Sequence, residues 1–176
     1  IKKMMPDVQF DFNAIAKGAG IDMMAKYLEE LNVSRYLIEI GGEVIVSGLN
    51  QHNSNWVIGI ANPDDIASKL IESISVSDVA IATSGTYENF FHLDDVKYSH
   101  IINPKNGMPV NHELVSATVI ANSALYADAL ATSFMVMGYE DSIEWANSNI
   151  DIECYLVARI DDGEYKIGYS ENFPIH

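Results

Sequence analysis

The stretch SALYADALATSFMVMG, residues 123–138, indicates most clearly how this chain folds. Ser123 lies just before the apolar segment, where a hydroxyl can cap a helix, and Gly138 lies where helices commonly end. Nearly every residue between them is apolar, which is typical of a helix buried inside a domain. We therefore predict a helix across this stretch, enclosed by the rest of the fold.

Two polar side chains, Asp128 and Thr132, interrupt this apolar helix. They are four residues apart, so they share one face of the helix, one turn from each other. A buried carboxylate needs a cation, hydrogen-bond donors or an open cleft, and a carboxylate oxygen beside a hydroxyl suits a hard cation such as Mg²⁺. A purely structural explanation stays open, in which Thr132 bonds back to the carbonyl of Asp128 and Asp128 caps a neighbouring loop.

Composition limits the class of protein. The chain has 176 residues, with 10 Lys and Arg against 25 Asp and Glu, and its net charge is −15. The length predicts one domain, residues 1–176, and the negative charge argues against nucleic acid or anionic membranes as partners. An anionic ligand would need a lysine, a helix N-terminus or a metal nearby. The single cysteine, Cys154, cannot form an internal disulfide and lies in an apolar run, so we expect it to be buried.

The pattern along the chain predicts more strands than helices. We expect helices at residues 21–32, 123–138 and 142–147, and an irregular loop at 101–110. Alternating or β-branched runs predict strands, many of them joined as hairpins, at 7–13, 36–40, 43–47, 56–61, 70–76, 79–83, 90–93, 96–100, 115–120, 154–160 and 165–169. The fold class that follows is α+β, with a largely antiparallel sheet and a few covering helices.

Three further positions are candidates for binding. Lys17 follows a predicted strand and precedes a helix, so it is either a surface lysine or the cation that offsets a bound phosphate. Ser84 and Gly85 belong to a group of hydroxyls around a glycine at a strand end, which suits a turn or a phosphate or ribose contact. His100 precedes the long loop, where polar site residues tend to gather, although a lone histidine is more often structural.

Together, three groups of residues resemble the ApbE family, the FAD:protein FMN transferases. The groups are DFNAIAKG (11–18) with GGE (41–43), ATSGTY (82–87) with HIINPKNGMP (100–109), and ADALAT (127–132) after the strand at 115–121. The resemblance extends over nearly all of this chain and over the C-terminal part of a typical member. It implies an ApbE-like (T-fold-like) domain, with the family's N-terminal part outside this sequence.

The resemblance also implies a metal site and a nucleotide site. Asp128 and Thr132 correspond to side-chain Mg²⁺ ligands, Ala14 to a backbone carbonyl ligand, and Leu125 to the position of a further carbonyl. The implied contacts with the flavin nucleotide are Asp11, Lys17, Ser84, Gly85, His100 and Ile101. His100 corresponds to a histidine near the FAD pyrophosphate, and the implied catalytic group is His100, Asp128 and Lys17.

The activity that the resemblance implies is Mg²⁺-dependent transfer of FMN from FAD, the substrate, to a Thr or Ser hydroxyl of a partner flavoprotein, with release of AMP. A redox-pump subunit is the kind of acceptor expected. Two alternatives stay open: an FAD pyrophosphatase that uses water as the acceptor, and a non-catalytic flavin-binding module. The resemblance further implies an exported protein, in the periplasm or on the outer face of the inner membrane, with a lipid anchor outside this chain.

Overall fold

The computed structural model describes residues 2–86, 90–93, 96–160 and 164–175. Its centre is a six-stranded sheet in which every neighbouring pair of strands is antiparallel. The order across the sheet is β1 (Tyr36–Ile40), β2 (Glu43–Ser47), β5 (Val79–Gly85), β10 (Leu114–Ala121), β11 (Glu153–Arg159) and β12 (Tyr165–Tyr169).

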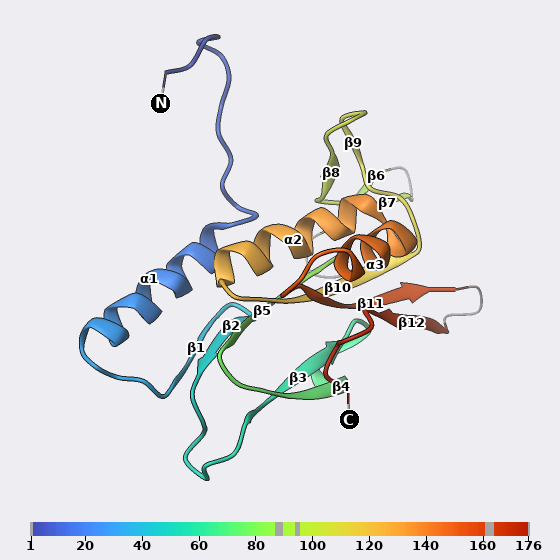
Figure 1. Ribbon diagram of the computed structural model, residues 1–176. Coiled ribbons are helices and arrows are strands. Elements are labelled where there is room, and N and C mark those ends of the chain that lie inside the picture. Colours follow the sequence, from blue (N-terminus) through green and yellow to red (C-terminus); the bar gives the residue numbers. More distant parts are fainter. Residues whose placement is uncertain (1, 87–89, 94–95, 161–163, 176) are drawn as a thin grey trace.

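Helices cover one face of this sheet, and a separate two-stranded ribbon covers the other (Figure 1). The helices are α1 (Ala16–Glu30), α2 (Ala124–Met137) and α3 (Tyr139–Asn147), and the ribbon pairs β3 (Trp56–Asn62) with β4 (Asp65–Val76). This arrangement confirms the prediction of an α+β fold with a largely antiparallel sheet and covering helices. Within the described part of the chain, no helix is long and apolar enough to cross a membrane.

Both faces of the sheet are packed, because successive side chains of a strand point to opposite sides. In β10, Val119 belongs to the apolar cluster beneath α2 and α3, whereas its neighbour Ile120 belongs to the cluster shared with β3 and β4. In β5, Ala82 likewise belongs to the cluster beneath the helices, and its neighbour Ile81 belongs to the cluster shared with β3 and β4. The predicted thiol burial is also confirmed, since Cys154 is fully buried in the cluster beneath the helices.

Helix α2 begins and ends where the sequence predicts. The Ser123 hydroxyl accepts a hydrogen bond from the N–H of Tyr126 (3.2 Å), and Gly138 ends the helix with φ of 94°, a left-handed value that favours glycine. The prediction that the rest of the fold encloses this helix is wrong for its first turn, where Leu125 is 38% and Tyr126 47% exposed. The helix is buried on the face that packs against β5 and β10 and reaches solvent on the other.

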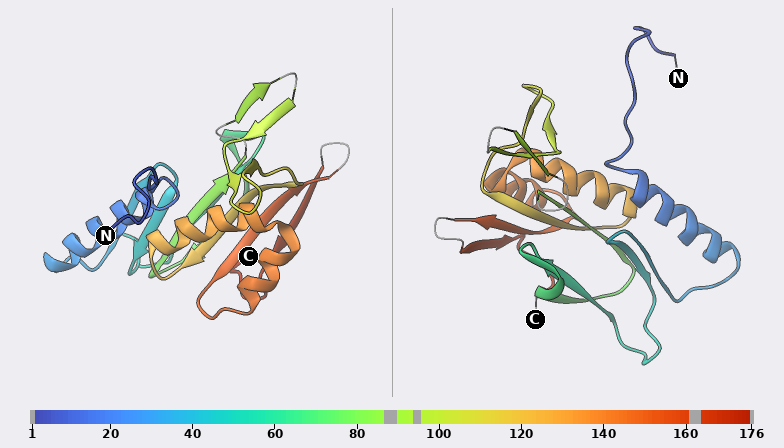
Figure 2. Two further views of the ribbon diagram at one scale, coloured as in Figure 1. Left: turned by 90° about the horizontal axis from the view of Figure 1, so that it is seen from above. Right: turned by 180° about the vertical axis from the view of Figure 1, so that it is seen from behind.

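Residues 7–13 do not form the predicted strand. They lie in an exposed segment that leads away from the sheet (Figures 1 and 2). Phe10 and Phe12 stack on each other there, with ring centroids 6.1 Å apart, and the carboxylate of Asp11 accepts a hydrogen bond from the N–H of Asn13 (2.8 Å). Alternation of polar and apolar residues predicts a strand only if another strand lies alongside to pair with its backbone, and in the described structure none pairs with this segment.

The loop at 101–110 is more regular than predicted. It contains two short paired strands, β8 (Ile102–Asn103) and β9 (Met108–Pro109), joined by a turn in which Gly107 has φ of 70°. The side chain of Asn103 stabilises this turn by accepting a hydrogen bond from the N–H of Lys105 (2.9 Å). Just before it, β6 (Phe90–Leu93) and β7 (Val96–Ser99) pair as predicted, although the turn between them lies outside the described residues.

Helices α1 and α2 meet at their N-terminal ends. Asp22 of α1 accepts hydrogen bonds from the N–H groups of Ala124 (2.8 Å) and Leu125 (3.0 Å) and from the hydroxyl of Ser123 (3.0 Å). A carboxylate at this point satisfies N–H groups that have no partner within α2 and interacts favourably with the helix dipole. The contact fixes the first turn of α1 beside the polar face of α2.

Candidate functional site

A cleft of about 580 Å³ opens where the start of α1, β2, the end of β5, the start of the β8–β9 loop and the polar face of α2 come together. It is lined by Asp11, Asn13, Ala14, Lys17, Glu43, Thr83, Ser84, Gly85, His100, Ile101, Ile102, Asp128, Thr132 and Val136. Segments far apart in the sequence thus supply carboxylates, hydroxyls and a lysine to one cavity. This mixture can bind a polar, charged ligand.

Asp128 lies at the buried end of this arrangement and is only 3% exposed. One of its oxygens, Oδ2, accepts a hydrogen bond from the backbone N–H of Gly18 (3.0 Å). Gly18 is in the first turn of α1, whose N-terminal residue Ile15 provides no side-chain cap, so Asp128 serves as an acceptor for that helix end. Burial raises the pKa of the Asp128 carboxyl, while the Gly18 N–H and the charge of Lys17 act in the opposite direction.

Thr132 lines the cleft one turn after Asp128, as the helical spacing predicts. Its hydroxyl shares a hydrogen bond with the hydroxyl of Ser84 on β5, at 3.0 Å. Either hydroxyl can be the donor in this pair. Whether Ser84 accepts the bond or donates it, the Thr132 oxygen still has a lone pair available for a ligand. The pair ties the polar face of α2 to the strand beneath it.

Lys17 and Glu43, which also line the cleft, form an ion pair. The Nζ atom of Lys17 lies 2.7 Å from Oε1 of Glu43 and donates a hydrogen bond to the carbonyl of Gly41 (3.3 Å). The Lys17 side chain is 40% exposed, whereas that of Glu43 is 2% exposed. Burial raises the pKa of Glu43 and the charge of Asp128 raises it further, while the hydrogen bond and charge of Lys17 lower it.

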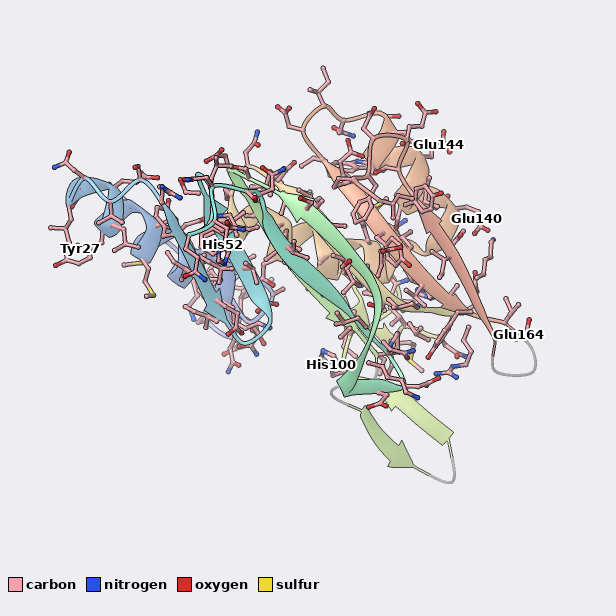
Figure 3. All side chains as sticks on the ribbon, turned by 90° about the horizontal axis from the view of Figure 1, so that it is seen from below. Tyr27, His52, His100, Glu140, Glu144 and Glu164 are labelled. Carbon is pink, nitrogen blue, oxygen red and sulfur yellow. The ribbon has the colours of Figure 1, made fainter. Side chains whose placement is uncertain are left out.

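The structure brings together nearly all of the site residues that the sequence suggested. Asp11, Ala14, Lys17, Ser84, Gly85, His100, Ile101, Asp128 and Thr132 all line the cleft. His100 lies at the end of the sheet near the β6–β7 hairpin, far from Tyr27 of α1 (Figure 3). Leu125 is outside this lining, in the exposed first turn of α2, where its N–H donates to Asp22.

Sequence reasoning assigned no role in the site to Glu43 or Asn13, which both line the cleft. The signal for Glu43 was present, because it is an acidic residue at the start of an apolar strand directly after Gly41 and Gly42. A carboxylate in such a position is either exposed at the strand end or buried against a cation. Only the packing of α1 against β2, which brings Lys17 alongside, distinguishes these two cases.

The residues of the cleft fit a magnesium ion. Asp128 and Thr132 offer the carboxylate and hydroxyl oxygens that hard cations prefer, and Ala14 lines the same cleft. Among the described residues, no group of three or more His, Cys, Asp or Glu is placed to hold a metal. The two side-chain oxygens of Asp128 and Thr132 would suit Mg²⁺, since that ion usually keeps several waters and binds phosphate oxygens of a substrate.

Comparison with known proteins gives a consistent family match. The model of the ApbE family matches residues 1–156. A protein of Vibrio cholerae named FAD:protein FMN transferase is 42% identical over 163 residues, covering 93% of this chain, and one of Haemophilus influenzae with the same name is 37% identical over 164 residues. The chain spans about half the length of these curated relatives, 48% of the first and 47% of the second.

Solved structures agree in fold. The flavin transferase ApbE from Vibrio cholerae has a TM-score of 0.83 and 42% identity, covering 96% of this chain and 53% of that structure. The ApbE protein from Thermotoga maritima has a TM-score of 0.82 and 32% identity, and the match covers 94% of this chain and 52% of the Thermotoga maritima chain. Both sequence and fold therefore relate this chain to the same group of proteins.

Proposed function

This chain belongs to the ApbE family, and from that premise we propose that it forms part of an enzyme that transfers FMN from FAD to a Thr or Ser hydroxyl of a partner flavoprotein, releasing AMP. The observation that carries the proposal is the cleft that Asp128 and Thr132, one helical turn apart, line together with Lys17. The relatives named FAD:protein FMN transferase support flavin transfer as the reaction.

In this proposal Asp128, Thr132 and the backbone of Ala14 hold Mg²⁺. A Mg²⁺ ion held there would supply positive charge for the phosphate oxygens of the substrate. In this proposal Asp128 acts as a metal ligand and not as the base, and its Oδ2 also accepts a hydrogen bond from the N–H of Gly18. That hydrogen bond orients the carboxylate before any ligand arrives.

The remaining residues bind and orient the nucleotide. Lys17 lies at the start of α1, where its positive charge and the N-terminus of the helix both favour an anionic group. His100, with Ser84 and Gly85, lines the same cleft and would contact the pyrophosphate. In the transfer, the acceptor hydroxyl oxygen bonds to the phosphorus of the FMN part and its proton passes to solvent water. The P–O bond from that phosphorus to the bridging oxygen breaks, and AMP leaves with that oxygen. Such chemistry depends mainly on positioning and electrostatics.

The test uses the intact protein with FAD, Mg²⁺ and a fragment that carries an acceptor sequence of the type Asp-Gly-x-Ser/Thr-Gly-Ala-Thr. Mass spectrometry then measures whether the fragment gains the mass of FMN, while free FMN and AMP are followed by chromatography. We expect attachment that depends on Mg²⁺. Free FMN and AMP without attachment would identify a pyrophosphatase, and FAD that binds but stays intact would identify a binding module.

The matched variants are Asp128→Ala, which removes the carboxylate, and Thr132→Val, which keeps the shape and removes the oxygen. We expect Asp128→Ala to lose metal-dependent turnover and Thr132→Val to need more Mg²⁺ for half-maximal rate. Unchanged turnover in Asp128→Ala would rule out the proposed site. Unchanged Mg²⁺ dependence in Thr132→Val would restrict Thr132 to its hydrogen bond with Ser84.

A further inference from the structure

Glu43 has an acceptor oxygen for which the described structure provides no partner. Its side chain is 2% exposed and its Oε1 pairs with Lys17 at 2.7 Å. The other oxygen, Oε2, is buried and makes no hydrogen bond within the described part of the chain, although the residue lines the cleft. A buried carboxylate oxygen without a donor is destabilising, so a donor that enters the cleft would remove this penalty.

The charges around Glu43 favour a ligand that brings such a donor. Two buried carboxylates line the cleft, Glu43 and Asp128; the charge of Asp128 acts on Glu43, and Lys17 is the cation that acts on both. One positive charge against two negative charges leaves an excess of negative charge inside a poorly solvated cavity. A hydrated cation, or a group with a polarised N–H or O–H, is attracted to this position.

We propose that Glu43 is a positioning residue with two separate contacts: Oε1 holds Lys17, and Oε2 accepts a hydrogen bond from a donor brought by the ligand. The donor is either a water molecule in the hydration shell of the cation or an N–H or O–H group of the nucleotide. This inference rests on the proposed function, because it assumes that a cation and a flavin nucleotide share the cleft. Nothing in it requires Glu43 to touch the metal itself.

The test depends on a difference between a carboxylate and an amide. Glutamate has two acceptor oxygens, whereas glutamine has one acceptor and one donor group of the same shape. In Glu43→Gln, the amide oxygen can face either Lys17 or the ligand, and the amide N–H₂ then faces the other donor. The variant therefore cannot make both contacts, although it conserves the volume of the side chain.

Isothermal titration calorimetry on the intact protein would measure binding in two arms, Mg²⁺ alone and FAD alone with a chelator present. We expect Glu43→Gln to bind one of these ligands about 10- to 100-fold more weakly, as for loss of a charged hydrogen bond. Loss in the Mg²⁺ arm identifies a metal-bound water as the donor, and loss in the FAD arm identifies a nucleotide group. Equal or tighter binding in both arms, by a folded variant, would overturn the proposal.

Two comparisons separate this role from a general effect on folding or charge. Glu30→Gln removes the same charge from the exposed end of α1 and should leave both affinities unchanged. If Glu43→Gln does not fold, Lys17→Met/Glu43→Leu replaces the pair with apolar groups, a change that proteins often tolerate. This double variant should bind more weakly than Lys17→Met alone, and equal binding would refute the proposal.

The same titrations distinguish failure of this inference from failure of the proposed function. A wild-type protein that binds neither Mg²⁺ nor FAD would overturn both. Loss of Mg²⁺ binding in Asp128→Ala, together with full binding of both ligands in Glu43→Gln, would leave the proposed function intact and refute only the role of Glu43.

Discussion

Gly18 and Gly20 lie two residues apart in α1, yet we expect opposite effects when each is replaced by alanine. A Cβ atom added at Gly18 would lie 2.3 Å from the carbonyl oxygen of Ala124 and 2.7 Å from the Cα atom of Leu125. A Cβ atom added at Gly20 would meet only the Cδ1 atom of Ile40, at an ordinary 3.7 Å. The first contact is with the backbone of α2, which no side-chain rotation can move.

The magnitudes follow from this geometry. Within a helix, Gly→Ala is favourable by at most about 1 kcal/mol, and Gly20→Ala should gain part of that. Gly18→Ala has the same gain at best, but it must separate the two helices by about 1 Å to restore a 3.4 Å contact. Overpacking of this kind destabilises by about 1–3 kcal/mol or more, so we expect a net loss of about 2 kcal/mol.

Gly18→Ala should also disturb the candidate site. The N–H of Gly18 donates to Asp128, and a shift of α1 would lengthen that 3.0 Å hydrogen bond. If Mg²⁺ binds as proposed above, Gly18→Ala should bind it more weakly, whereas Gly20→Ala should bind it as the wild type does. Calorimetric titration with Mg²⁺ would measure the difference.

Thermal and urea denaturation provide the stability assay. For a domain of this size, 1 kcal/mol corresponds to about 2–4 °C in Tm. Gly18→Ala should therefore lower Tm by about 4–8 °C, while Gly20→Ala should leave Tm unchanged or raise it by a few degrees. If Gly18→Ala were as stable as Gly20→Ala, the two helices could not approach each other as closely at Gly18 as described. The expected effect of this variant on the Gly18–Asp128 hydrogen bond would then fail as well.

Three further predictions concern other parts of the fold. Asp22→Ala should destabilise the protein by about 1–2 kcal/mol in urea denaturation, because the first turn of α2 loses the acceptor that three of its groups use; unchanged stability would contradict the capping role. Burial raises the pKa of Cys154 to about 12 from an ordinary 9.0. Because only the thiolate reacts, alkylation of Cys154 at pH 9 should be at least about 500-fold slower in the native than in the unfolded protein. Equal rates would refute the burial of this thiol. Hydrogen bonds from Ser77 and from the N–H of Gly48 lower the pKa of Asp78, so the stabilisation by its carboxylate is present above pH 3.8 and is lost as the pH falls through the lowered value. Asp78→Asn should therefore make the free energy of unfolding depend less on pH in this acid range. An unchanged pH dependence would refute this role of Asp78.

Much of the architecture could be predicted from sequence because its causes are local. The cap at Ser123 begins α2 and the left-handed Gly138 ends it, whatever lies around the helix. The pair Gly41-Gly42, with positive φ at both residues, makes the turn between β1 and β2. Spacing along a helix likewise places Asp128 and Thr132 on one face. These features depend on backbone geometry over a few residues.

Other features depend on what lies alongside, and the sequence could not show this. Residues 7–13 alternate like a strand but pair with no described neighbour, so the same pattern gives an exposed segment. Leu125 lies on the same helix as Asp128, but it is outside the cleft lining, and its N–H donates to Asp22 of α1. Whether a residue of a correctly predicted element reaches the site is decided by packing between elements.

Glu43 shows most clearly the difference between what local sequence determines and what tertiary packing decides. Its sequence position established that a carboxylate begins an apolar strand, but its neighbours are Lys17, 26 residues earlier, and Asp128, 85 residues later. Spacing rules for a helix or a strand reach only a few residues, whereas a buried charge is balanced by groups that the whole sheet and both helices bring together. The sequence by itself determined which chemical groups this protein has and which local faces carry them, and the tertiary structure decided which of those groups share one cavity.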